Sequence, residues 1–319
     1  MGIGDSTSSG TSISSFADDT RLLRGITNTQ DCLDLQADLN KVYSWAENIG
    51  MVFNAKKFEV IRFWSAKDSS PSFAYLGPDQ SPIEEKDDLR DLGVKISNNL
   101  RFQTQIESAV QSATQTAGWA LRTFKHRGKY LMLVILRSLI QPRLNYCSEL
   151  WSPRDQTTIN LIERVQKNFV SKIKDESLIG ANYWQKLTRL GIYSQERRRE
   201  RQQICFVWKV SQGLVDGYDI DFSHSDRRGR YAVPRKVKLT AAAVVRKARE
   251  GSLGVHAVRL FNLLPPHLRN EDSRDFDLFK NHLDIFLSTV PDEPTTPGLT
   301  RQAATNSLID QIPLCGDSV

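Results

Sequence analysis

Two adjacent carboxylates near the start of the chain are the residues best suited to chemistry. Asp18 and Asp19 follow a run of strand-forming residues, Thr11–Ala17, and precede a second apolar run at Leu22 and Leu23. This order predicts a β-hairpin with both carboxylates at its tip. Carboxylate oxygens suit Mg²⁺, and in two-metal phosphoryl transfer such ions activate the attacking oxygen and stabilise the leaving one. Because Asp is also common in solvated turns, the pair alone does not decide between the two interpretations.

The sequence around the pair resembles a known catalytic motif. Ser15-Phe16-Ala17-Asp18-Asp19-Thr20 is similar to the catalytic hairpin of reverse transcriptases from non-LTR (LINE-type) retrotransposons, especially jockey-like elements. Further segments resemble, in the family's order, the helix and strand after the hairpin, the primer-grip turn and the thumb region. They are Leu35–Asn40, Trp45, Gly50–Asn54, Lys56-Lys57, Asp91–Val94, Gln141–Cys147, Leu150–Pro153, Val165–Lys167, Leu190–Ile192, Glu196–Arg199 and Leu263–Pro266.

The resemblance implies a specific activity and a role for several residues. The activity is RNA-directed DNA polymerisation, with Mg²⁺ as the cofactor and an RNA template and a DNA primer as partners. Asp18 and Asp19 are then the catalytic metal ligands. Lys56 or Lys57 is expected to approach the phosphates of the incoming nucleotide, or else the two form a solvated pair before a strand. Gly93 is expected to permit the tight primer-grip turn, although an ordinary turn glycine would look the same.

The position of the hairpin in the chain leads to a further expectation. In the family, the fingers and the first palm acid precede this hairpin, and the 15 residues before Phe16 cannot hold them. We therefore expect a carboxy-terminal fragment of the enzyme that is inactive alone, because two-metal catalysis needs another acid. Two alternatives stay open, a non-catalytic nucleic-acid-binding module and a decayed gene product without function.

Basic residues gather in the second half of the chain. Lysine and arginine outnumber aspartate and glutamate by 43 to 37, which gives a formal net charge of +6. One cluster comprises Arg197, Arg198, Arg199 and Arg201 at the start of a predicted helix, and a second, in a predicted long loop over 213–237, includes Arg227, Arg228, Arg230 and Lys236. We expect both to bind nucleic acid through phosphate contacts. The alternative is a solvated or internally paired helix face.

The pattern of apolar residues predicts an α+β fold in two parts. Residues 1–10 are predicted to be disordered, and 11–100 to form a β-hairpin, a helix and a short β meander over 51–96, which the resemblance identifies with a partial polymerase palm. Residues 101–290 are predicted to be mainly helical, with helices over 102–124, 131–140, 157–173, 194–212 and 276–287, and the resemblance implies a thumb and carboxy-terminal region there. The proline-containing stretch 291–319 is predicted to be a disordered tail.

The absence of a targeting signal and the few cysteines indicate the cellular compartment of the protein. No secretion signal precedes the hairpin, and the most apolar run, 130–140, contains Arg137 and is too short to span a bilayer. The four cysteines lie too far apart for a zinc pattern and are too few for a disulfide scaffold. The sequence therefore predicts a protein of the cytoplasm or nucleus with no membrane partner.

Core packing is predicted for five tryptophans, Trp45, Trp119, Trp151, Trp184 and Trp208.

Overall fold

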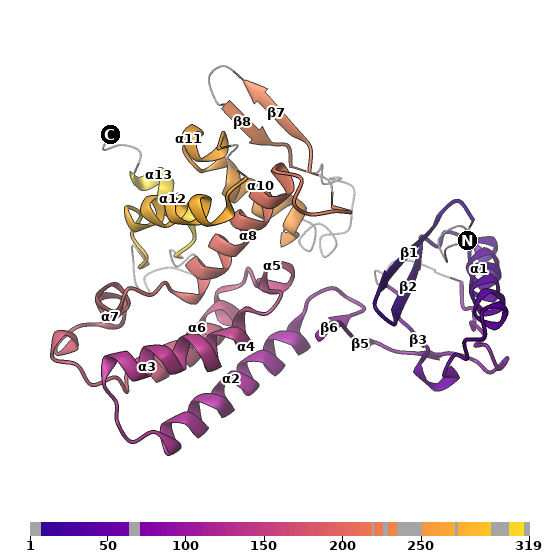
Figure 1. Ribbon diagram of the computed structural model, residues 1–319, viewed down its shortest axis with the longest axis horizontal. Coiled ribbons are helices and arrows are strands. Elements are labelled where there is room, and N and C mark those ends of the chain that lie inside the picture. The colour runs from indigo at the N-terminus through magenta and orange to yellow at the C-terminus, as the bar shows by residue number, and fades with distance from the viewer. Residues whose placement is uncertain are drawn as a thin grey trace. The chain divides into compact units, whose positions relative to one another are not determined.

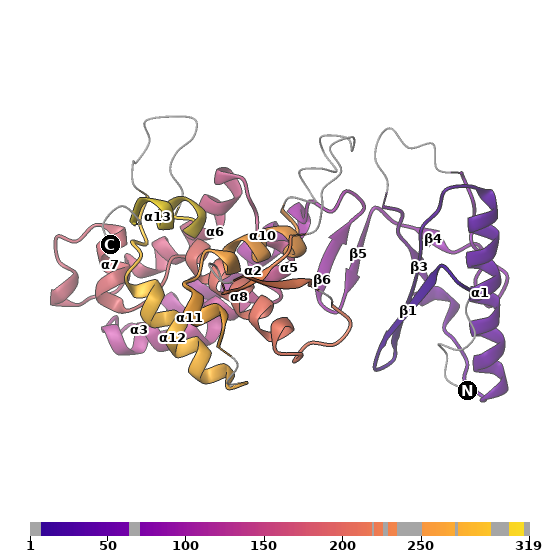
Figure 2. The same cartoon turned by 90° about the horizontal axis from the view of Figure 1, so that it is seen from above.

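The chain folds into helices and short strand pairs, an α+β fold as predicted (Figures 1 and 2). The computed structural model describes residues 8–63, 71–218, 220–225, 229–234, 251–271, 274–294 and 306–315. Two compact units divide the chain, Met1–Leu100 and Arg101–Val319. The division coincides with the boundary that the change from strand to helix pattern predicts.

The first unit opens with an antiparallel hairpin and a long helix. Strand β1 (Thr11–Phe16) pairs with β2 (Asp19–Arg24), and helix α1 (Thr29–Asn48) follows. The helix begins at a capping box, in which the side chains of Asn28 and Asp31 each accept a hydrogen bond from the other's backbone N–H, both 3.1 Å long. Its apolar residues recur every three or four positions, so that Cys32, Val42 and Ala46 are buried.

The rest of the first unit corrects the predicted meander. The helical turn η2 (Ala55–Lys57) precedes a parallel pair, β3 (Glu59–Val60) with β4 (Glu84–Glu85), and an antiparallel pair, β5 (Asp88–Asp91) with β6 (Val94–Ser97). Among the described residues these pairs do not join into one sheet. Side chains of α1 bond the connecting chain instead: the Gln36 amide accepts from the N–H of Leu76 (2.7 Å) and donates to its carbonyl (3.1 Å). Backbone groups satisfied in this way need no neighbouring strand.

Helices build the second unit, beginning with a layer around an alanine-lined helix. Its first members are α2 (Gln103–Thr123), α3 (Lys129–Ile135), α4 (Gln141–Asn145), α5 (Ser148–Trp151), α6 (Gln156–Val170) and α7 (Tyr183–Leu190), with a π-helical turn η3 (Leu136–Ile140) and a 3₁₀ turn η4 (Glu176–Leu178). Ala109, Ala113, Ala117 and Ala120 are buried on one face of α2. These small side chains let α2 pack against α6, η3 and α4.

A second cluster of helices closes around the core of this unit. Its members are α8 (Gln195–Ser211), α10 (Leu253–Asn262), α11 (Pro266–Arg269), α12 (Phe276–Ser288) and α13 (Leu308–Cys315). Trp208 of α8 stacks on Phe279 of α12, with the ring centroids 4.6 Å apart. Leu308 of α13 is buried in the same core, so this helix is part of the folded unit.

Two predicted irregular segments contain regular structure. Within the predicted loop, β7 (Phe222–Ser225) and β8 (Gly229–Ala232) form an antiparallel hairpin. The hairpin docks on α10, because the Asn262 amide bonds both the N–H and the carbonyl of Ala232 (2.9 and 2.8 Å). The predicted disorder of 291–319 is wrong for residues 306–315, which include α13.

The tryptophans follow the core prediction only in part. Trp151 and Trp208 are buried, and Trp45 and Trp184 are partly buried. Trp119 is 49% exposed, because it lies off the alanine face by which α2 meets its neighbours. None of the helices in the described part of the chain is both long and apolar enough to cross a membrane.

Candidate catalytic hairpin and the arginine cluster

A strained two-residue turn holds the predicted catalytic carboxylates. Phe16 pairs with Asp19 as the last rung of the hairpin, so that Ala17 and Asp18 form the turn. Ala17 has a φ of 52°, in the left-handed region that favours glycine, and an alanine there costs about 1 kcal/mol. The turn therefore places two successive carboxylates at the end of the ribbon, where Asp18 and Asp19 are both exposed.

The donor chemistry of this pair fits part of a magnesium site. Mg²⁺ is usually held by one or two carboxylates together with waters and substrate phosphates, and Asp18 and Asp19 supply two such carboxylates. Across the described residues, no group of three or more His, Cys, Asp or Glu side chains is arranged to hold a metal ion. Further ligands would therefore come from a substrate or from residues outside those described.

The predicted primer-grip turn is tied to the same hairpin. Arg21, on β2, lies 2.6 Å from the carboxylate of Asp91, and its Nε donates to the same oxygen at 2.7 Å. Asp91 begins the β5–β6 turn, in which Leu92 and Gly93 have φ values of 44° and 84°. Two successive positive φ values define the type I′ hairpin turn, which favours glycine. Gly93 thus permits the turn, as the sequence predicts, and Arg21 fixes the turn to β2.

The two candidate nucleotide-binding lysines lie on the exposed turn η2. The Asn54 side chain caps this turn by accepting from the N–H of Lys56 at 3.1 Å. The side chains of Lys56 and Lys57 form no hydrogen bond or ion pair with any described residue, and both are exposed. Their charges are available to a phosphate, and the solvated interpretation of the pair stays equally open.

The arginine cluster of α8 begins with a residue that is fully buried. Arg197 has no exposed surface, and its guanidinium donates to three backbone carbonyls near the end of the chain. The acceptors are Val290 (3.2 Å), Pro291 (2.8 Å) and Asn306 (3.2 Å). The guanidinium therefore fastens two segments of the chain terminus to the start of α8.

The other three arginines of the cluster also face protein. Arg199 is buried, donates to the Leu144 carbonyl at 2.6 Å and stacks on Trp151. The Arg201 guanidinium donates to both carboxylate oxygens of Asp284, at 2.5 and 2.7 Å. Burial lowers the pKa of Arg198, whose side chain is partly exposed.

These contacts correct the prediction of a phosphate-binding cluster. Arg197 has no exposed surface, Arg199 is 4% exposed, and Arg201 is already paired with a carboxylate. These side chains cannot together meet a continuous nucleic-acid backbone without unfolding of their surroundings. The alternative of a helix face that is paired within the protein therefore describes Arg197 and Arg201, whereas Nε and Nη1 of Arg199 have no partner within the described structure.

The second basic cluster is described only in part. Arg230 lies on β8, where its N–H donates to Asn270 at 2.7 Å and its carbonyl accepts from Arg269. Arg227, Arg228 and Lys236 lie outside the described residues, so their predicted role stays a prediction.

A buried polar network beside α8 was missed by the sequence analysis. Glu163 of α6 accepts from the Gln195 N–H at 2.7 Å and from the Tyr183 hydroxyl. Burial raises the pKa of Glu163 to about 7. Gln166 lies at the centre of this polar network, and its amide donates to the Tyr193 carbonyl at 3.0 Å. The available signal was the position of Gln166, four residues after Ile162 on the apolar stripe of α6.

Comparisons with known proteins identify no family. No protein-family model matches the chain, and no solved structure matches it. The chain is similar to an uncharacterized protein of Caenorhabditis elegans, with 23% identity over 130 residues. The aligned region is 40% of this chain and 64% of that protein.

Proposed function

We propose that this chain carries the catalytic hairpin and the region behind it of an RNA-directed DNA polymerase, a reverse transcriptase of the non-LTR retrotransposon type. The observation that best supports this is the tip of β1–β2, where two exposed carboxylates follow a strained alanine in a segment that resembles the family's catalytic motif. Strained backbone positions gather at functional sites. In this proposal the first unit is the back of the palm, and the second is the thumb and helical connection.

The candidate site residues of the first unit have distinct roles in the proposed enzyme. Asp18 and Asp19 hold Mg²⁺, which when bound activates the attacking hydroxyl and neutralises charge on the phosphates. Arg21 keeps the hairpin against the turn at Gly93, which supports the primer end. Lys56 and Lys57 bring positive charge to the triphosphate, acting as point charges.

The proposed site needs a further acid. The described residues place no third metal-binding side chain beside Asp18 and Asp19. We therefore expect the chain alone to incorporate no deoxynucleotide on a primed RNA template. Incorporation that depends on Asp18 would contradict this expectation.

A non-catalytic nucleic-acid-binding module is the second candidate. Its main support in the sequence is the cluster of Arg197, Arg198, Arg199 and Arg201, and the contacts of these side chains within the protein remove much of that support. The polymerase proposal rests on the hairpin and not on this cluster.

Primer extension tests the catalytic role. When the chain is joined to the fingers and first palm acid of a related enzyme, Asp18→Asn and Asp19→Asn should each lower kcat by several orders of magnitude, because the metal ligand loses its charge. Asp216→Asn is the matched control, since Asp216 is exposed in the second unit. Near-normal turnover by Asp18→Asn and Asp19→Asn would show that the hairpin is wrongly assigned.

Metal binding by the chain alone gives a second readout. Mn²⁺, a paramagnetic substitute for Mg²⁺, should broaden the amide NMR signals of residues 16–20 before those of other exposed acids. Asp18→Asn should remove the selective broadening, and Asp216→Asn should not. Equal broadening at all exposed acids would mean that the hairpin has no preference for the ion.

A further inference from the structure

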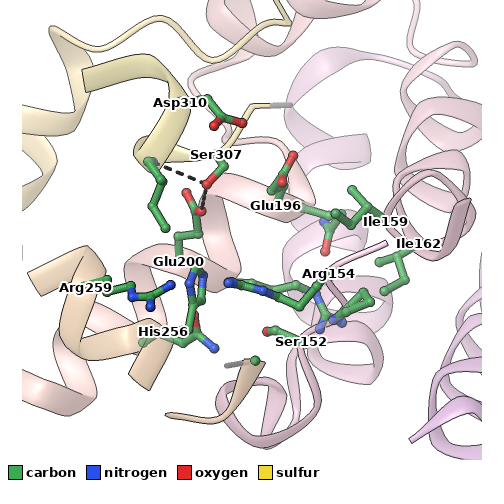
Figure 3. A pocket seen from close by; sticks show the side chains of 16 residues that line it. Ser152, Arg154, Ile159, Ile162, Glu196, Glu200, His256, Arg259, Ser307 and Asp310 are labelled. Atoms are coloured by element: carbon green, nitrogen blue, oxygen red, sulfur yellow. Dashed lines mark hydrogen bonds between the residues drawn. The ribbon is translucent and has the colours of Figure 1, made fainter. Parts of the chain in front are cut away.

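A charged cavity in the second unit is separate from the proposed polymerase site. It has a volume of about 380 Å³ and lies among α8, α10, the start of α13 and the segment before α6 (Figure 3). Three arginines line it, Arg154, Arg199 and Arg259, together with His256 and three acids. No step of the proposed polymerisation uses these residues.

Two arginines reach this cavity without a bonding partner. Arg154 precedes α6 and Arg259 lies on α10, and in Figure 3 their guanidinium groups point toward His256 from opposite sides. Both residues are exposed, and neither side chain forms a hydrogen bond or an ion pair with any described residue. Partial desolvation at the cavity lowers the pKa of Arg154 and Arg259 adds to this, while Glu200 opposes it. Two like charges that face one space attract an anion between them.

Buried polar atoms in the wall also lack partners. Arg199 and His256 are each only 4% exposed. Nε and Nη1 of Arg199 and Nδ1 of His256 have no hydrogen bond within the described structure. Leaving such groups unpaired costs free energy, and buried polar groups in proteins nearly always find a protein, water or ligand partner.

Two of the three acids in the wall bond residues 306–308 rather than the arginines. Glu200 accepts from the Ser307 hydroxyl (2.5 Å) and the Leu308 N–H (2.8 Å), and Glu196 accepts from the Asn306 N–H (3.0 Å). Burial raises the pKa of Glu196 to about 8 and that of Glu200 to about 7. Burial thus favours the neutral form of these two glutamates, while Asp310, the third acid of the wall, acts on Arg154 as an opposite charge.

We propose that this cavity binds a phosphomonoester, either the phosphate of a free nucleotide or the 5′-terminal phosphate of a nucleic-acid strand. A terminal phosphate presents three free oxygens to the guanidinium groups of Arg154 and Arg259, which bind such oxygens in a bidentate manner. An internal phosphodiester continues on both sides, and a recess walled by four segments accepts an end more readily than a continuous strand. The proposal does not depend on the polymerase assignment.

Binding of three probes tests the proposal and identifies the source of the phosphate. The probes are a fluorescent single-stranded oligonucleotide with a 5′-phosphate, the same strand with a 5′-hydroxyl, and adenosine monophosphate as a competitor. The 5′-phosphate should raise the affinity of the strand about tenfold, the effect of one or two charge-assisted hydrogen bonds. Adenosine monophosphate that binds as tightly as the phosphorylated strand identifies a nucleotide site, and weaker binding of the monophosphate identifies a strand-end site.

Variants of the cavity arginines distinguish binding in this cavity from non-specific attraction by the positive charge of the protein. Arg154→Gln and Arg259→Gln should each weaken binding of the phosphorylated strand about tenfold. The matched control is Arg164→Gln, which removes the same charge from the exposed face of α6 and should leave binding unchanged. Thermal unfolding followed by circular dichroism checks that all three variants are folded.

Three results would overturn the proposal. The first is the same affinity for the 5′-phosphate and 5′-hydroxyl strands, or no binding of any probe. The second is unchanged affinity in both cavity variants. The third is an equal loss in Arg164→Gln, which would mean that the strand responds only to net charge.

Discussion

Replacing Arg197 by methionine is the sharpest test of how the second unit is held together. The guanidinium has no exposed surface and donates to the carbonyls of Val290, Pro291 and Asn306 at 2.8–3.2 Å. Methionine keeps a long flexible side chain but supplies neither the donors nor the charge. The substitution leaves three buried carbonyls without this partner.

The size of the effect follows from these contacts. A hydrogen bond from a charged donor contributes about 1.5–3 kcal/mol, so three bonds set an upper limit of several kcal/mol. Methionine offsets part of this loss, because its burial avoids the cost of desolvating a charge. We therefore expect Arg197→Met to lower the free energy of unfolding by about 3–5 kcal/mol, the range typical of breaking a buried charged network.

Urea unfolding and hydrogen exchange measure the change in two independent ways. The variant should unfold at lower urea, and residues 306–315 should lose protection before the rest of the unit, since Arg197 binds the Asn306 carbonyl. Arg164→Met, at an exposed position of α6, should change stability by less than about 0.5 kcal/mol.

One combination of results would refute this account of Arg197. It is a loss of less than about 1 kcal/mol, with unchanged exchange at 306–315 and weaker, less salt-dependent binding to RNA. Each phosphate contact contributes to the salt dependence of binding, so that result would return Arg197 to the nucleic-acid surface that the sequence predicts.

Two further predictions concern pH and the hairpin tip. The folded-state pKa values of Glu163 and Glu200 (about 7) and Glu196 (about 8) lie above the ordinary value of 4.5, so these three groups bind more protons in the folded chain than in the unfolded one. Their contribution to stability is fully present below about pH 4.5 and is lost as the pH rises through 7–8. Burial lowers the pKa of His256 to about 3, and the opposite dependence of this group ends near its ordinary value of 6.5. Urea midpoints should therefore fall from about pH 6.5 to 8, and Glu163→Gln should make that fall shallower. An unchanged slope in Glu163→Gln would contradict the assignment. At the tip, Ala17→Gly should stabilise the first unit by about 1 kcal/mol, because glycine tolerates the positive φ, whereas Ala37→Gly, exposed in α1, should destabilise it by a similar amount. Thermal unfolding measures both changes, and equal losses in the two variants would show that the turn is unstrained.

Local patterns predict the hairpin region well. The run before Asp18, the three- and four-residue spacing of apolar positions in α1 and the glycine at position 93 each depend on a few neighbouring residues. Those interactions form within one strand, helix or turn, so the sequence contains the whole signal. The separate strand pairs of the first unit were not predicted, because the side chain that replaces a neighbouring strand, Gln36, lies 40 residues from Leu76.

The arginine cluster shows why composition misleads. Arginines 197, 198, 199 and 201 have the same chemistry in the sequence, and only their partners distinguish them. One available signal is periodicity: Arg197 lies seven residues before Ile204 and eleven before Trp208, on the same buried stripe of α8. A stripe position predicts burial, but the carbonyls that make the burial tolerable lie about 90–110 residues further along the chain.

Two side chains, Glu196 and Glu200, both hold residues 306–308 against α8 and line the charged cavity. Glu196 and Glu200 bond the Asn306 and Leu308 N–H groups and also form part of the cavity wall. Buried polar groups are tolerated where they find partners, and residues 306–308 supply such partners for the two glutamates. These residues therefore fix the position of two acids of the cavity wall, and Arg154 in that wall acts electrostatically on Glu200. The amino-terminal half of α8 accordingly buries polar side chains that bond distant segments of the unit, and an apolar half follows.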